Sequence, residues 1–472
     1  MQHISLPTKF VYWVGQLAEG LKNTAFGVFL LFYYNQVLGV SGTLCGTALF
    51  IGMAFDAVTD PLMGSISDGW RSKYGRRHPF MYASAVPLGL CFFLLFNPMV
   101  EGETGLFIWL LVFVVLTRFS MTLYHVPHVA LGAEMTSDYH ERNTLAAGRM
   151  VFNSVGALTV YGLGFGVFFA ASEAFPNGQL NGDAYPPYAA ILGVGMCVAI
   201  LVTSIGTRHL VPHLPVPRAS QQLKLTALFK DMWAASNNRS FIWLITGFVV
   251  VSVPVGVGTS LQLYLNTFFW EVPPEAISII LGSGVVATFF GFAASPWIMR
   301  RIEKKQALFV GSIGWALFYA SPVVLHYAGL FPAPGSEAVV IALAISHFLA
   351  GAVVSQLIVA VISMLADVAD EQELATDKRQ EGVFFGAYSF VIKATGGLGA
   401  ATSGIVLDII EWPTGESVQS AADVPTETLF QLAMVAGPAL AIGFIPAVLL
   451  WRNYKLTKHR HEEILTELQA GA

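Results

Sequence analysis

The chain has 472 residues, of which 55% are hydrophobic and only 12% are charged. A soluble protein of ordinary composition carries about 25% charged residues, so this composition excludes a soluble globular protein and indicates a membrane protein. The formal net charge of −5 comes with no basic domain and no stacked-aromatic motif, so nothing supports a nucleic-acid partner.

In chain order, we find twelve apolar segments of about 20 residues, the length of helix that crosses a bilayer. They are expected at residues 11–38, 43–66, 79–98, 106–130, 148–171, 187–207, 241–269, 277–299, 307–328, 338–362, 383–409 and 429–451. The longest polar connection divides them into two sets of six. The predicted organisation is a six-helix bundle over 1–207, a cytoplasmic central loop over 208–240, a second bundle over 241–451 and a cytoplasmic tail over 452–472.

The basic residues indicate the orientation in the membrane. Four of the 25 Lys and Arg lie in or near the predicted spans, and the other 21 lie in the N-terminus, the loops after spans 2, 4, 6, 8 and 10, and the C-terminus. The remaining loops carry acids such as Glu101, Asp183 and Glu416. Because cytoplasmic loops are enriched in Lys and Arg, this asymmetry predicts cytoplasmic termini, and we expect a plasma (inner) membrane location.

Two acidic residues interrupt the second span, at Asp56 and Asp60. Residues four apart lie on one face of a helix, one turn apart. A single ionised Asp at the membrane centre costs about 2.5–3.5 kcal/mol on insertion scales, so a pair requires a cation, a proton or a polar cavity. We interpret the pair as a coupling-ion site. The alternative is a polar pair that only holds helices together or that lies near water at a helix end.

Two local patterns recur six spans apart. The glycine- and base-rich segment 64–77 follows span 2, and the basic segment 300–305 follows span 8. Segment 131–135 (Leu-Gly-Ala-Glu-Met) follows span 4, and segment 364–368 (Met-Leu-Ala-Asp-Val) follows span 10. Such repeats indicate a transporter whose two halves move about a central site.

The overall plan resembles the major facilitator superfamily, and the local motifs resemble its cation-coupled glycoside-pentoside-hexuronide symporters, the melibiose-permease group. The motifs are residues 56–61 (Asp-Ala-Val-Thr-Asp-Pro) with Gly64, residues 71–80 (Arg-Ser-Lys-Tyr-Gly-Arg-Arg-His-Pro-Phe), Glu141-Arg142 with Arg149, and residues 381–386 (Glu-Gly-Val-Phe-Phe-Gly) with Lys393. The resemblance implies an all-α membrane protein with twelve transmembrane helices in two pseudo-symmetric six-helix bundles.

The resemblance also implies roles for individual residues. Asp56 and Asp60 would bind Na⁺, Li⁺ or H⁺, and Thr59 would add an oxygen ligand, because hard cations prefer several oxygens. Lys393 lies about ten residues into its span and would be the charge partner of the acids, with a lysine that reaches the membrane interface as the alternative. Arg149 would help to bind the solute, or would be a plain surface charge.

Departures from the melibiose-permease pattern leave the solute open. Glu19-Gly20 replaces an adjacent Lys and Asp in span 1, and the span 4 carboxylate is replaced by His125. His125 and His128 lie on one helical face, either as a proton relay or as hydrogen-bonded packing residues. The substrate-binding candidates are Glu19, His125, Arg149, Tyr124, Tyr264 and Tyr388. The alternative for each tyrosine is a polar contact between helices.

The segment from Gly64 to Arg77 resembles the gating loop of the superfamily. Gly64 would allow close helix approach, and Asp68 would pair with a basic residue near a neighbouring helix end. The gating candidates are Gly64, Asp68, Arg71, Arg76, Arg77, Asp367 and Asp370, the last two as a matching latch in the second half. The alternative is that the basic cluster only sets topology.

The predicted function is a cation-coupled (Na⁺ or H⁺) symporter that imports a small polar solute, such as a glycoside, sugar or sugar acid, by alternating access. In such a transporter, ion and solute stabilise the same occluded state. A lysophospholipid symporter is one alternative, which the 35 Phe residues and the missing sugar-site acids fit, and a non-transporting receptor or channel is another. The sequence has no Walker-type phosphate loop and no clear pairing of nucleophile and base, so we expect no enzyme. We expect a functional monomer whose partners are a solute, a coupling cation and the bilayer, with no cofactor.

Overall fold

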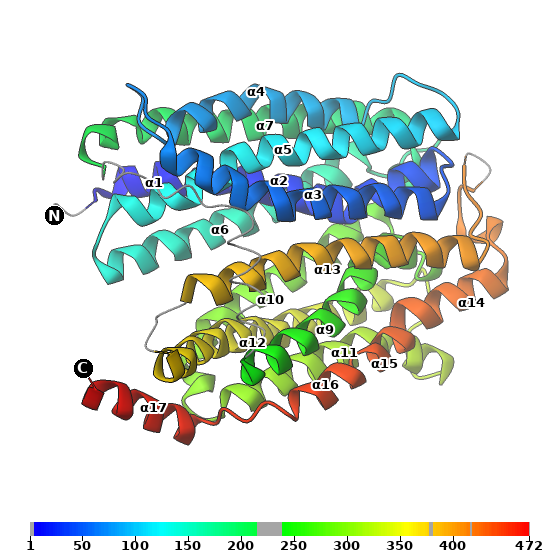
Figure 1. The fold of residues 1–472 in the computed structure, drawn as a ribbon. Coiled ribbons are helices and arrows are strands. Elements are labelled where there is room, and N and C mark those ends of the chain that lie inside the picture. The colour runs from blue at the N-terminus through cyan, green and yellow to red at the C-terminus, as the bar shows by residue number, and fades with distance from the viewer. Residues whose placement is uncertain (1–3, 215–237, 377–380, 416–417, 472) are drawn as a thin grey trace. The chain divides into compact units, whose positions relative to one another are not determined.

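The computed structural model describes residues 4–214, 238–376, 381–415 and 418–471, and within these ranges all regular structure is helical (Figure 1). In this part of the chain, eleven helices are long and apolar enough to cross a membrane. This confirms the predicted all-α membrane fold. The chain forms two compact units, the first within Met1–Leu223, Pro273–Ser278 and Ser403–Val424, and the second within Lys224–Val272, Ile279–Thr402 and Pro425–Ala472.

The first unit contains the helices of the predicted N-terminal bundle. They are α1 (Leu6–Val14), α2 (Gln16–Ala25), α3 (Gly42–Gly69), α4 (His78–Leu95), α5 (Glu103–Met135), α6 (Tyr139–Leu163) and α7 (Tyr185–Gly206). Wider π-helical turns continue α2 over Phe26–Leu30 and Tyr33–Val37, and α6 over Gly164–Phe168. Of the predicted central loop 208–240, residues 215–237 lie outside the described residues, and the domain boundaries there stay a prediction.

The second unit contains most of the remaining helices. They are α9 (Arg239–Tyr264), α10 (Pro274–Met299), α11 (Lys304–Tyr327), α12 (Glu337–Thr376), α13 (Glu381–Ile409), α14 (Thr426–Met434), α15 (Leu440–Gly443), α16 (Ile445–Trp451) and α17 (Lys458–Gly471). The first turn of α10 and the last turns of α13 belong to the first unit. The predicted C-terminal tail, 452–472, contains a helix, α17, which packs on α12 with Ile464 buried.

The predicted span 11–38 is not among the eleven apolar helices. Its first turns carry Gln16, Glu19, Lys22 and Asn23, which lower its mean hydropathy. The regular helix is also interrupted at Gly15, between α1 and α2. This segment is helical as expected, but it is too polar to qualify by composition.

Several helices start with a capping side chain or with a proline in the first turn. The Asp138 side chain accepts a hydrogen bond from a backbone amide in the first turn of α6, and Asn238 does the same for α9. Glu303 and Gln306 form a capping box at the start of α11. Pro186 lies in the first turn of α7, where its missing amide costs no hydrogen bond.

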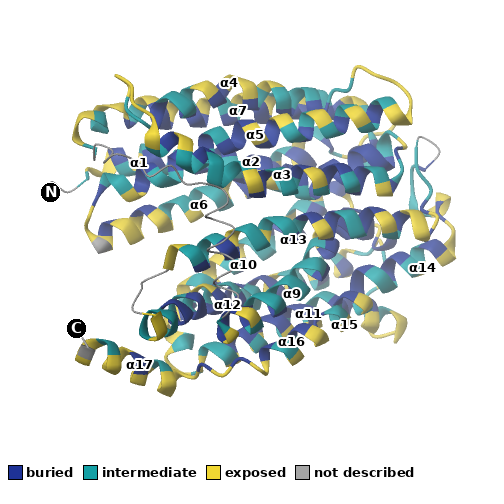
Figure 2. Ribbon diagram, viewed as in Figure 1, coloured by how far each residue is buried: buried dark blue, intermediate teal, exposed yellow. Residues whose placement is uncertain are grey.

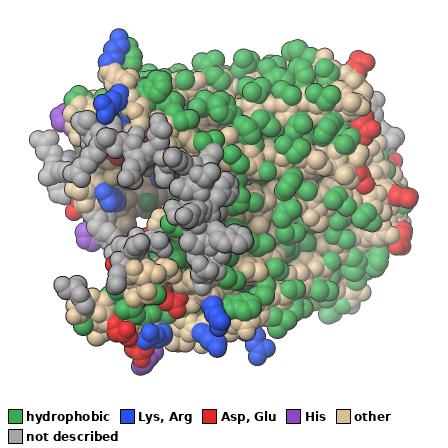
Figure 3. Space-filling view, in the orientation of Figure 1, with side chains coloured by type: hydrophobic (Ala, Val, Ile, Leu, Met, Phe, Trp, Pro, Cys, Tyr) green, Lys and Arg blue, Asp and Glu red, His purple; other side chains and the backbone are tan. Residues whose placement is uncertain are grey.

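Many of the helices have a buried face and an exposed face, and the exposed face is rich in apolar side chains. Figure 2 shows buried and exposed residues alternating along the helices, which is the pattern of a helix with one face in a bundle. Figure 3 shows hydrophobic side chains over much of the face in view. Large hydrophobic residues on the helices, such as Val86, Ile191 and Val194, are more than half exposed. Exposed apolar flanks of this length are suited to lipid, as expected for an integral multi-pass membrane protein.

Candidate functional site

Helices α3 and α5 lie side by side in the first unit and bring their polar residues into register. Asp56 contacts Arg118, and one turn further along both helices Asp60 contacts Thr122. Both pairs are separated by 62 residues in the sequence. The two acids that the sequence predicts on one face of a helix therefore both face α5.

Asp56 forms a buried ion pair with Arg118. The guanidinium Nη1 lies 2.5 Å from Asp56 Oδ2, and the two side chains are only 7% (Arg118) and 10% (Asp56) exposed. Asp56 Oδ1 is buried and has no hydrogen-bond partner among the described residues. The Arg118 guanidinium also lies 5.5 Å from the centre of the Phe26 ring, a cation–π distance. The structure thus gives Asp56 a charge partner that the sequence analysis did not predict.

Asp60 accepts a hydrogen bond from Thr122, whose Oγ1 lies 2.7 Å from Asp60 Oδ1. The hydroxyl of Thr59 instead donates to the Phe55 carbonyl of its own helix, at 3.0 Å. Its role as an oxygen ligand stays a prediction. Lys393 lies on α13 in the second unit, and its pairing with the acids also stays a prediction.

A second polar cluster joins α2, α5 and α6. His125 Nδ1 lies 3.1 Å from Glu19 Oε2, and the two side chains are 25% and 21% exposed. Gln16 donates a hydrogen bond to the same Glu19 carboxylate and accepts one from Arg149 Nε at 3.2 Å. Three substrate-binding candidates from three helices are therefore brought together, linked by Gln16.

His128 lies in a different environment from His125. It is fully buried, its ring lies between Tyr12 and Tyr124 with centroid distances of 4.5 and 5.0 Å, and its Nε2 lies 3.0 Å from the Tyr12 carbonyl. This environment favours a packing role, the second of the two alternatives that the sequence leaves open, and the proton relay stays a prediction. Tyr124 is fully buried as well, and this favours its interpretation as an interhelical contact.

The other two tyrosine candidates lie in the second unit. Tyr264, at the end of α9, is fully buried, and Tyr388, on α13, is 8% exposed with its ring 5.2 Å from that of Phe248. Neither tyrosine presents much surface to a solute in this conformation.

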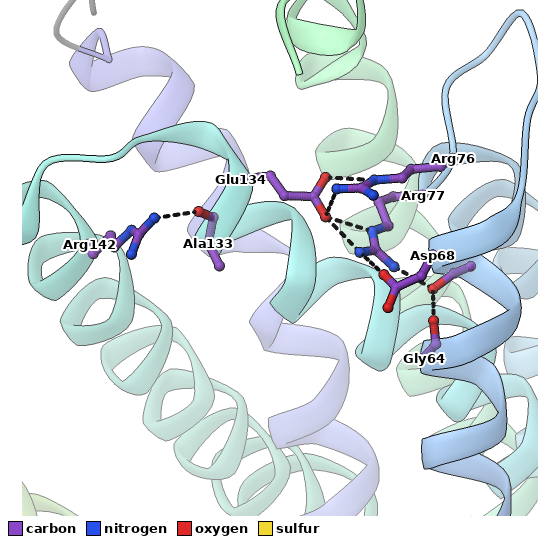
Figure 4. Close-up of polar contacts among 8 residues, drawn as sticks. Gly64, Asp68, Arg76, Arg77, Ala133, Glu134 and Arg142 are labelled. Atoms are coloured by element: carbon purple, nitrogen blue, oxygen red, sulfur yellow. Dashed lines mark hydrogen bonds and ion pairs between the residues drawn. The ribbon is translucent and has the colours of Figure 1, made fainter. Parts of the chain in front are cut away.

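Charged residues at one end of α3, α4 and α5 form a compact cluster (Figure 4). Arg76 and Arg77 both bind Glu134, with Nη2 to Oε1 distances of 2.9 and 2.6 Å. Arg77 also reaches Asp68 and the Ser67 hydroxyl, and it is only 4% exposed. Asp68 thus pairs with a basic residue at a neighbouring helix start, as predicted. Glu134, the acid that Arg76 and Arg77 share, is not among the gating candidates and appears in the sequence analysis only within the repeated segment 131–135.

Segment 64–77 contains two further gating candidates, Arg71 and Gly64. Arg71 is exposed. Gly64 lies beside Val126, but a Cβ added at Gly64 would be 3.8 Å from it, an ordinary contact, so close helix approach does not depend on this glycine. The tight approach of α3 to α5 lies at Gly52, where a Cβ would be 2.3 Å from Val114.

The second unit repeats the acid–base pattern. Lys304, the first residue of α11, lies 2.7 Å from both Asp367 oxygens, as Arg76 and Arg77 at the start of α4 bind Glu134. His461 on α17 lies 2.9 Å from Asp370. The contacts reproduce the internal repeat that the sequence shows, and both latch candidates have partners.

Comparison with known proteins gives consistent matches over the whole chain. A family model described as MFS/sugar transport protein matches residues 11–458. The chain is 25% identical over 472 residues to the putative glycoside/cation symporter YagG of Escherichia coli (strain K12), covering 99% of this chain and 96% of that protein. It is also 25% identical over 507 residues to sodium-dependent lysophosphatidylcholine symporter 1 of Gallus gallus, covering 99% and 90%. A solved structure of a mutant of the nucleoside transporter NupG matches the fold with a TM-score of 0.65 at 14% identity, covering 94% of this chain and 99% of that one.

Proposed function

The chain belongs to the family of MFS/sugar transport proteins, and from that premise we propose that it is a cation-coupled symporter that imports a small polar solute by alternating access. The coupling ion is Na⁺ or H⁺, and the solute is a glycoside, sugar or sugar acid. The name of the relative YagG, a putative glycoside/cation symporter, supports this proposal.

The observation that carries the proposal is the acid pair on α3. Asp56 and Asp60 lie one turn apart within an apolar helix, each with a polar partner on α5. Two carboxylates in a membrane span are costly unless a cation or a proton compensates them. A site of this kind can link the binding of a cation to the conformation of the helices that carry it.

The cluster of Glu19, His125 and Arg149 supports a polar solute. It offers a carboxylate, an imidazole and a guanidinium from three helices, and the Glu19 and His125 side chains are about a fifth to a quarter exposed. A polyhydroxylated solute needs such donors and acceptors, whereas an acyl chain does not. We propose this cluster as part of the solute site. The lysophosphatidylcholine symporter among the relatives makes a lipid solute the outcome to test against.

The location and assembly of the protein are part of the same proposal. The distribution of Lys and Arg supports a plasma (inner) membrane protein with both termini in the cytoplasm. We propose that the working unit is a monomer, because one chain supplies both halves of the fold.

The test is gradient-driven accumulation of radiolabelled glycosides and sugar acids in proteoliposomes. An imposed Na⁺ or H⁺ gradient should drive accumulation by the wild type, and Asp60→Asn should abolish it while leaving folded protein. Glu173→Gln is the matched control, because it makes the same carboxylate-to-amide change at an exposed loop residue. Full concentrative uptake by Asp60→Asn would contradict the proposal, and accumulation of lysophospholipid alone would replace the solute class.

A further inference from the structure

The Arg118 side chain occupies a space beside α3 that a glycine leaves open. Gly52 lies one turn before Asp56, and a Cβ added there would be 3.0 Å from Arg118 Cδ and 3.2 Å from Arg118 Nε. A larger residue at position 52 would also overlap Val114, at 2.3 Å, and would crowd the arginine. Through this gap the guanidinium reaches Asp56 Oδ2, with the Phe26 ring 5.5 Å away. The packing at Gly52 thus places one cation, the Arg118 guanidinium, at the Asp56 carboxylate.

The guanidinium changes the charge of the acid pair. Asp56 and Asp60 together carry two negative charges when ionised, and Arg118, which keeps its charge in proteins, compensates one of them. A metal cation bound by both acids would lie close to this fixed positive charge. It would also have to share Asp56, of which Oδ2 already holds the guanidinium, while Oδ1 is buried without a partner among the described residues.

We propose that Arg118 is a tethered cation that competes with the coupling metal ion for Asp56 and thereby sets the ion affinity and ion selectivity of the site. The inference rests on the proposed function, because it assigns a role to Arg118 within the same ion site. A Na⁺ or Li⁺ ion that binds both acids must either share the Asp56 carboxylate with the guanidinium, through Oδ1, or displace the guanidinium from it. Arg118 is therefore a specificity-determining residue, and it weakens metal binding.

The alternative is that Arg118 supports metal binding rather than competing with it. If the guanidinium only fixes the orientation of the Asp56 carboxylate, its removal disorders the site and weakens metal binding. The two roles predict changes of opposite sign, so one titration separates them.

The experiment measures the Na⁺ concentration that gives half of the maximal thermal stabilisation, for purified protein at alkaline pH with choline as the balancing cation. A ligand that binds only the folded state raises the unfolding temperature by mass action. Replacing Arg118 by Gln removes a positive charge within a few ångströms of the site, so we expect the half-saturating Na⁺ concentration to fall about tenfold or more. The double variant Asp56→Asn/Arg118→Gln is the control, and it should lose that gain.

Arg118→Lys keeps the test decisive if too little folded Arg118→Gln is recovered. Lysine lacks the planar fork that holds a carboxylate and is more strongly hydrated, so it competes less well for Asp56. We expect the half-saturating Na⁺ concentration to be highest in the wild type, lower in Arg118→Lys and lowest in Arg118→Gln. Equal or weaker Na⁺ binding by the substituted proteins would overturn the inference.

The outcome for Arg118 is separable from the outcome for symport. If Na⁺ stabilises neither the wild type nor Arg118→Gln, the inference fails, whereas symport is judged by gradient-driven accumulation and by Asp60→Asn. If Asp60→Asn accumulates solute as the wild type does, the proposed function fails, whatever Na⁺ does to the Arg118 variants.

Discussion

Glu134 at the end of α5 provides the most direct test of the charged cluster in Figure 4. Glu134→Gln keeps the shape of the side chain but removes the negative charge that both Arg76 and Arg77 bind. The Glu134 side chain is 10% exposed and that of Arg77 is 4% exposed, so the charges are poorly solvated. Breaking a buried ion pair in this way typically costs about 3–5 kcal/mol.

The expected loss lies at the lower end of that range. Arg77 keeps its contact with Asp68, whose side chain is 49% exposed and therefore better solvated. We expect Glu134→Gln to lower the free energy of unfolding by about 3 kcal/mol. The assay is a denaturant titration in detergent followed by tryptophan fluorescence. Glu173→Gln, on an exposed loop, should change the same free energy by less than about 0.5 kcal/mol.

A double-mutant cycle separates the pair from other effects of the substitution. Arg77→Gln and Glu134→Gln should each destabilise the protein, and the double variant should lose less than the sum, with a coupling energy of about 0.5–3 kcal/mol. Additive effects, or a loss for Glu134→Gln no larger than for Glu173→Gln, would refute the reasoning. The gating role of this cluster stays a prediction, which the uptake rates of the same variants would test.

Two further predictions concern the contact between α3 and α5. Gly52→Ala places a Cβ 2.3 Å from Val114 Cγ1 and 3.0 Å from Arg118 Cδ, so overpacking should lower the free energy of unfolding by about 1–3 kcal/mol. Gly162→Ala, where no atom of the described residues lies within 4 Å of the added Cβ, should show no such loss, and equal stability of the two variants would contradict the packing argument. Thr122→Val removes the hydrogen bond to the Asp60 carboxylate and should cost about 1.5–3 kcal/mol in the same denaturant titration. Thr122→Ser should restore most of that stability, and a serine variant as unstable as the valine variant would show that the hydroxyl is not responsible.

The sequence allows the fold to be predicted because membrane spans have a simple signal. Length and hydropathy indicate twelve spans, and eleven of them are helices in the described part of the chain that are long and apolar enough to cross a membrane. The repeat at Glu134 and Asp367 reappears as a repeated acid–base contact. The first span is the exception, because Glu19 and Lys22 lower its hydropathy. Glu19 is also one of the residues that we propose for the solute site. Polarity within a span therefore indicates function and obscures the span at the same time.

Partners across helices are harder to predict than the acids themselves. Asp56 and Asp60 are visible from their spacing, but Arg118 and Thr122 become their partners only through the register of α5 against α3. A signal is present in the sequence, since Arg118 and Thr122 are also four residues apart. Without the packing, nothing in the sequence favours α5 over another helix as the neighbour of α3. The family resemblance points to Lys393, whose pairing with the acids stays a prediction.

The measurement that tests the central claim most directly is the thermal stability of the purified protein against Na⁺, Li⁺ and pH, in the wild type and in Asp60→Asn. A cation that binds the folded protein at the acid pair raises the unfolding temperature of the wild type. By mass action, a cation concentration of about 100 times Kd raises the free energy of unfolding by about 2.7 kcal/mol. We predict a response to at least one of these cations, including the proton, that is lost in Asp60→Asn. An equal response in both proteins, or no response in the wild type, would contradict the assignment of Asp56 and Asp60 as the coupling-ion site.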